Sequence, residues 1–150
     1  MVDASGAPDG AADVPLGRAA LVAALSAMVV NASIYLLSVA LGAFDALGWF
    51  PASREDEMTL GPVLLVSLVS ALVGVGVFGI VRRRVERAFR SFAVIAGVVL
   101  VVSFVGPLVM DWPPAQVLVL ELMHVATAAA VLWAVRPAQW RGDGPGSGSA

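Results

Sequence analysis

The chain has 150 residues, of which 59% are hydrophobic and 13% are charged, and its formal net charge is −2. A soluble domain carries about 25% charged residues, so this composition argues against one. Cysteine is absent, which excludes a disulfide framework, a thiolate nucleophile and a cysteine-based metal site. Because the apolar residues gather into four long runs, we expect a polytopic membrane protein of one domain.

The two ends of the chain differ in character from the rest. Residues 1–15, MVDASGAPDGAADVP, are acidic and rich in small residues, and lack the basic and then apolar order of a signal peptide. We predict a disordered tail there. Residues 139–150 are rich in Gly and predict a second flexible tail. The four-helix transmembrane domain is expected over residues 16–138.

The four apolar runs cover residues 19–41, 61–81, 91–110 and 115–135. As helices, runs of this length cross a hydrocarbon core of about 30 Å. Open strands are excluded in lipid, because their unpaired backbone groups would have no partner. The sequence therefore predicts an all-α fold, a bundle of four transmembrane helices.

Prolines and one threonine indicate where these helices start and bend. Thr59 and Pro62 favour the start of the second helix, with Thr59 as its cap. Pro114 suits the first turn of the fourth helix. Pro107 lies inside the third run and is expected to disturb that helix near its end.

Eight of the nine basic residues, all arginines, fall on one predicted side of the membrane. These are Arg18 before the first run, Arg82, Arg83, Arg84, Arg87 and Arg90 between the second and third, and Arg136 and Arg141 after the fourth. By the positive-inside rule both termini are cytoplasmic and the protein lies in the cell membrane. The five central arginines also suit anionic lipid headgroups, although the topology signal alone accounts for them.

Small residues mark the second run as a packing helix. Ser67, Ser70, Ala71 and Gly74 share one face, with Gly76 and Gly79 farther along. Such residues let helix backbones approach closely within a membrane. A hinge or a substrate groove is the alternative.

Polar residues inside the runs predict a buried cluster. Two series fall on helix faces: Asn31, Tyr35 and Ser38 in the first run, and Glu121, His124 and Thr127 in the fourth. Counted from the outer ends of the runs, Tyr35 is level with Glu121 and Asn31 with His124. Exposing a carboxylate to lipid tails costs about 3 kcal/mol. We therefore predict a buried cluster of Asn31, Tyr35, Glu121 and His124.

Two roles for this cluster remain open. In the structural role, its hydrogen bonds fix the register of the helices, with Glu121 either neutral or ionised beside a protonated His124. In the functional role, the cluster handles protons or binds a small cation or polar ligand. Glu-x-x-His occurs in di-iron bundles, but the first three runs supply no carboxylate. We expect no metal, no cofactor and no catalytic set, and so no enzyme.

Several of these features together resemble a family of small four-helix prokaryotic membrane proteins of unknown function. They are Arg18, Asn31, the arginines from Arg82 to Arg90, Pro107, and the pair Met123 and His124. The resemblance covers residues 16–138 and implies a four-helix membrane fold, without an assigned activity.

These observations favour a structural or accessory membrane protein that acts through helix contacts. The alternative is a small transporter or proton-coupled carrier that uses Glu121 and His124. The expected partners are membrane lipids and either a second copy or another membrane protein. Nucleic-acid binding has no support beyond the arginine run.

Overall fold

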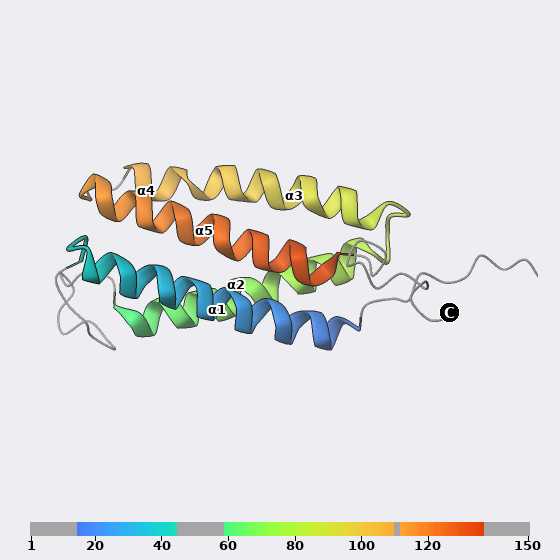
Figure 1. The fold of residues 1–150 in the computed structure, drawn as a ribbon. Helices are drawn as coiled ribbons and strands as arrows, with labels where there is room; N and C mark the ends of the chain where they lie inside the picture. Colours follow the sequence, from blue (N-terminus) through green and yellow to red (C-terminus); the bar gives the residue numbers. More distant parts are fainter. Residues whose placement is uncertain (1–14, 45–58, 110–111, 137–150) are drawn as a thin grey trace, which may run out of the picture.

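The structure, a computed structural model, describes residues 15–44, 59–109 and 112–136. These residues form helices and no strand (Figure 1): α1 (Leu16–Ala40), α2 (Leu60–Val81), α3 (Ala88–Ser103), α4 (Val105–Val109) and α5 (Pro114–Val135). Four helical stretches are long and apolar enough to cross a membrane, with α3 and α4 together forming the third. The predicted all-α fold with four such helices is confirmed. The predicted tails lie outside the described residues except for Pro15, and so do Arg54 and Arg141.

The ends of α1 follow from local sequence. The helix begins three residues earlier than predicted, directly after Pro15, and ends at Ala40. Gly42 follows with a φ of +76°, a conformation that glycine adopts without a steric penalty and that commonly terminates helices. The amide of Ala43 then donates to the carbonyl of Ser38 at 2.8 Å, which occupies one of the last free carbonyls of the helix.

The third span is interrupted near the predicted proline. Pro107 has no amide hydrogen to donate to the Ser103 carbonyl, and its ring crowds that carbonyl. The interruption falls at Phe104, between α3 and α4, as this mechanism requires. Pro114 is the first residue of α5, as predicted. Thr59 holds the cap position of α2, but its side chain makes no capping hydrogen bond, so that part of the prediction is wrong.

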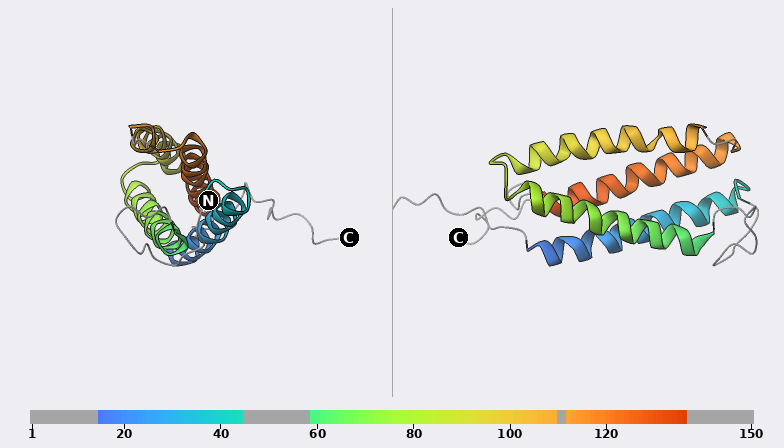
Figure 2. Two further views of the ribbon diagram at one scale, coloured as in Figure 1. Left: turned by 90° about the vertical axis from the view of Figure 1, so that its left-hand side faces the viewer. Right: turned by 180° about the vertical axis from the view of Figure 1, so that it is seen from behind.

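The helices do not contribute equally to the bundle. Helices α1, α2 and α5 pack against one another, whereas α3 contacts α2 and α5 but not α1 (Figure 2). Only 6% of the most apolar stretch of the third span is buried, compared with 28% in α1, 33% in α2 and 17% in α5. The bundle is therefore a three-helix unit with a loosely attached fourth helix.

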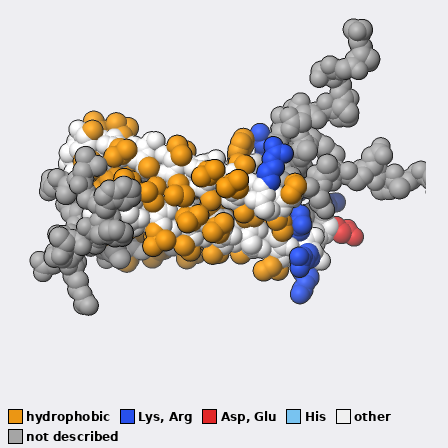
Figure 3. Space-filling model, turned by 90° about the horizontal axis from the view of Figure 1, so that it is seen from below, with side chains coloured by type: hydrophobic (Ala, Val, Ile, Leu, Met, Phe, Trp, Pro, Cys, Tyr) orange, Lys and Arg blue, Asp and Glu red, His pale blue; other side chains and the backbone are white. Residues whose placement is uncertain are grey.

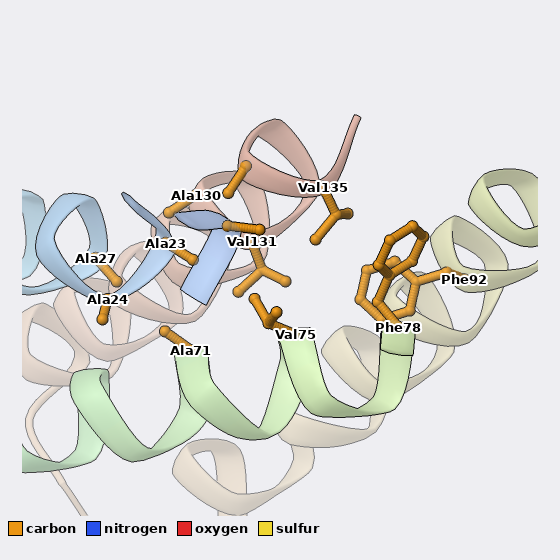
Figure 4. Close-up of a cluster of buried hydrophobic side chains, with 12 residues drawn as sticks. Ala23, Ala24, Ala27, Ala71, Val75, Phe78, Phe92, Ala130, Val131 and Val135 are labelled. Atoms are coloured by element: carbon orange, nitrogen blue, oxygen red, sulfur yellow. The ribbon is translucent and has the colours of Figure 1, made fainter. Parts of the chain in front are cut away.

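Small side chains let α1, α2 and α5 approach closely (Figure 4). Alanines of α1 face Ala71 and Val75 of α2 and Ala130 and Val131 of α5. A Cβ atom on Gly74 would lie 3.0 Å from Val131 Cγ1, and one on Gly79 would lie 3.0 Å from Leu16 Cδ1. The predicted packing role is confirmed for these two glycines. It is wrong for Gly76, whose Cβ would meet nothing within 4 Å because that position faces outward.

The described arginines gather at one end of the bundle, which we call the arginine end (Figure 3). They are Arg18, Arg82, Arg83, Arg84, Arg87, Arg90 and Arg136. The first residue of α1 and the last of α5 lie at the same end (Figure 1). Arg136 places its guanidinium 5.5 Å from the centre of the Trp133 ring, a contact typical of a cation on an aromatic face.

Candidate functional site

The side chain of Asn31 joins three helices. It is 3% exposed, and its amide nitrogen donates to Ser67 Oγ of α2 and to Thr127 Oγ1 of α5, both at 2.8 Å. Each amide hydrogen therefore has its own acceptor on a different helix. The result is a polar layer of three residues that fixes how α1, α2 and α5 lie along one another.

The orientation of this amide is determined by the two hydroxyls. Ser67 Oγ donates to the Val63 carbonyl at 2.6 Å, and Thr127 Oγ1 donates to the Met123 carbonyl at 2.9 Å. A hydroxyl has one hydrogen, so both groups are left only as acceptors, and the nitrogen of Asn31 must face them. The opposite atom, Asn31 Oδ1, is buried and has no hydrogen-bond partner.

The polar layer separates two apolar clusters. Toward the arginine end lies the alanine-rich core. In it, one alanine of each helix stands one helical turn from the polar layer: Ala27, Ala71 and Ala130. Toward the opposite end lies a cluster of Tyr35, Phe44, Val63 and Met123. Tyr35 is fully buried there, with its ring centre 5.7 Å from that of Phe44.

Glu121 lies apart from Asn31 and Tyr35. The side chains of residues 121 and 123 are related by a rotation of about 200° around the helix axis. Met123 packs beside Tyr35. Glu121 therefore points to the other side of α5. Both of its carboxylate oxygens are buried, and neither has a hydrogen-bond partner. No hydrogen bond therefore links Glu121 to His124.

His124 uses one ring nitrogen in a hydrogen bond to the backbone of its own helix. Its Nδ1 lies 2.7 Å from the carbonyl oxygen of Leu120, one turn earlier in α5. A carbonyl can only accept, so Nδ1 carries a hydrogen. In the neutral ring, Nε2 is then left with a lone pair, and it makes no hydrogen bond within the described part of the chain.

A cavity of about 540 Å³ lies between α2, α3 and α5. Its polar lining consists of Asn31, Ser67, Ser70, Ser103, His124 and Thr127, and the rest is apolar. Near the arginine end it is bounded by Phe92, whose ring meets that of Phe78 edge to face with centres 5.3 Å apart. Helix α3, which forms one wall of this cavity, does not contact α1.

The four predicted site residues thus have different surroundings. Asn31 and His124 line one cavity, Tyr35 belongs to an apolar cluster, and Glu121 lines neither. The partners of Asn31, Ser67 and Thr127, are absent from the predicted set. Their sequence signal is a hydroxyl on an inward helix face, at the same level of the bundle as Asn31.

A further polar contact holds the far end of the bundle. Gln116 Nε2 of α5 donates to the carbonyl oxygen of Ala43 at 3.1 Å, just after α1 ends. This bond ties the first turn of α5 to the end of α1. Across the described ranges, no group of three or more His, Cys, Asp or Glu side chains is placed to hold a metal ion.

Comparison with known proteins gives a family but no activity. No curated protein and no solved structure matches the chain. The model of a family of unknown function, DUF6069, matches residues 12–141, which include every described helix. The chain is a member of the DUF6069 family.

Proposed function

We propose that the protein is an accessory protein of the cell membrane that acts through helix contacts. In this proposal it crosses the membrane four times, with the arginine end and both termini in the cytoplasm. The observation that carries the proposal is the exposure of the third span, of which only 6% of the most apolar stretch is buried. Helices α1, α2 and α5 serve as the scaffold, and α3 presents its outer face to a partner.

The surface of α3 suits contact with another helix. Its exposed side chains are mostly valines, such as Val94, Val98 and Val101, at 59% to 67% exposure. Gly97 lies among them, with no atom within 4 Å of where its Cβ would be. Small and β-branched residues together allow close packing, which is the main source of helix association in lipid. We propose a second copy or another membrane protein as the partner.

Native mass spectrometry of the protein, released gently from its own membrane, tests this role. We expect an oligomer or a complex that Gly97→Leu dissociates. The matched control is Gly76→Leu, which adds the same side chain at an exposed position on α2. A monomer from the wild type, or equal effects of both variants, would contradict the proposal.

A carrier function is the second candidate, and Glu121 supports it. Two buried carboxylate oxygens without a hydrogen-bond partner leave capacity for a proton or a small cation, and unpaired carboxylates within membranes usually serve transport. Purified protein in proteoliposomes should then give a pH-dependent flux that Glu121→Gln removes. Equal flux with the Gln variant would exclude this function.

We also propose that the arginine end binds anionic lipid headgroups. Arg83, Arg84, Arg87 and Arg90 are exposed around the turn between α2 and α3. Each basic residue near an anionic surface contributes about 1 kcal/mol. Replacing Arg83 and Arg84 with Gln should reduce retention of phosphatidylglycerol over phosphatidylcholine in native mass spectra; unchanged retention would refute this.

A further inference from the structure

The polar groups in the cavity between α2, α3 and α5 are mainly hydrogen-bond acceptors. The hydrogens of Ser67 and Thr127 go to carbonyls of their own helices, and that of Ser103 goes to the Leu100 carbonyl at 2.7 Å. Both amide hydrogens of Asn31 are used as well. The exception is the exposed Ser70, whose hydroxyl is free to rotate and to donate or accept.

One accessible acceptor atom of the lining residues remains without a partner. It is Nε2 of His124, which in the neutral ring carries a lone pair because Nδ1 already donates to Leu120. Asn31 Oδ1 also lacks a partner, but this atom is enclosed by the protein and is not open to the cavity. A ligand with a donor group would therefore give His124 Nε2 a hydrogen bond that no described residue supplies.

The cavity also has a polar part and an apolar part. Its polar residues lie around the middle of its length, where Ser67 and Ser70 stand between Val66 and Val73 of α2. The part nearer the arginine end is lined by Val73, Val77 and Phe92. Val77 lies ten residues after Ser67, or about 15 Å farther along the helix. This stretch suits a medium-length apolar chain with a polar group at one end.

The absence of charge in the lining limits the ligand further. No Asp, Glu, Lys or Arg side chain is among the lining residues of this cavity, since Glu121 points elsewhere. A cation would find no carboxylate, and an anion would face the hydroxyl oxygens of the lining serines and Thr127. Both would also lose their hydration without compensation.

We propose that this cavity binds an uncharged, medium-chain apolar molecule that donates a hydrogen bond, an alcohol or a phenol. Its hydroxyl donates to His124 Nε2, and its chain extends along α2 and α3 toward Phe92. The site is distinct from the outer face of α3 that we propose as a partner contact.

The single histidine of the chain gives a direct readout. Protein labelled with ¹⁵N-histidine, in nanodiscs, is titrated with 1-decanol, with decyl methyl ether and with decanoate. We expect decanol to move the Nε2 resonance of His124 and to bind about tenfold more tightly than the ether. The ether has the same chain but no donor. Equal binding of alcohol and ether, tighter binding of decanoate, or no binding at all would overturn the proposal.

A pair of adjacent variants tests the location. Ala96 lines the cavity, whereas Gly97 is exposed with open space around it. Ala96→Phe should reduce decanol binding at least tenfold, and Gly97→Phe should leave it unchanged. If Gly97→Phe removes binding and Ala96→Phe does not, the ligand lies on the outer face of α3 and the cavity assignment is wrong.

Discussion

Asn31 shows how one side chain sets the relation between three helices. Its two amide hydrogens reach acceptors on α2 and α5, and these acceptors have already committed their own hydrogens to backbone carbonyls. The arrangement therefore accepts an NH₂ group and no other common group of that size. Hydrogen bonds between membrane helices contribute about 0.6 kcal/mol each on average. The network therefore adds little to the free energy of unfolding, but it restricts which side chain fits at position 31.

Substitutions at Asn31 should separate specificity from strength. Asn31→Leu removes two hydrogen bonds and an unsatisfied oxygen, two effects of opposite sign, and should change the free energy of unfolding by no more than about 1 kcal/mol. Asn31→Asp places oxygens against two hydroxyls without a free hydrogen, and should cost about 3 kcal/mol. Reversible unfolding in bicelles measures both. If Asp is tolerated as well as Leu, the assigned orientation of the amide is incorrect.

At the scale of elements, α2 and α5 approach closely at one glycine. Gly74 meets Val131, a β-branched side chain with little freedom to move away. Gly76 lies two residues later, on the outward side of the same helix. The two positions therefore form a matched pair for measuring what this contact contributes.

Leucine at these two glycines should have different effects. Gly74→Leu overpacks the contact with α5 and should destabilise the protein by about 1–3 kcal/mol. Gly76→Leu adds an apolar side chain in open space and should change stability by less than about 0.5 kcal/mol. Thermal unfolding of both variants in the same detergent provides the comparison. Equal melting temperatures would show that α2 and α5 do not rely on this approach.

At the scale of the whole molecule, the arginine end defines one side of the bundle. Because the chain has no native cysteine, single cysteines report the topology without background. Val85 is exposed at the arginine end, and Ala115 is exposed in the first turn of α5 at the other end. In intact cells a membrane-impermeant maleimide should label Ala115→Cys, and should label Val85→Cys only after the cells are opened. The reverse pattern would invert the proposed topology.

The spans could be predicted from the sequence because length and apolarity are properties of each run alone. The third span illustrates this, since the effect of Pro107 is local and appears at Phe104. The contacts of the polar residues depend instead on how the helices rotate and slide. A step of three residues turns about 60° around a helix. Glu121 and Thr127 therefore differ by about 120°, enough for Thr127 to meet Asn31 while Glu121 points away.

The cavity was not predictable for a related reason. Valines and small residues occur on every side of α3, so the sequence of this helix does not indicate which face packs against the other helices. Whether α3 fills the space beside Asn31 or leaves it open depends on side chains of three other helices.

The order of helices along the chain differs from their order in space, and this has a consequence for assembly. Helix α5 comes last in sequence, yet it packs against α1 and α2 and carries one partner of Asn31. The peptide link between α2 and α3 is thus not what holds α5 in place. Two fragments divided at Val85 and expressed together should recombine in the membrane and copurify. Thr127→Val should weaken this reassociation, whereas a change at exposed Leu118 of α5 should not.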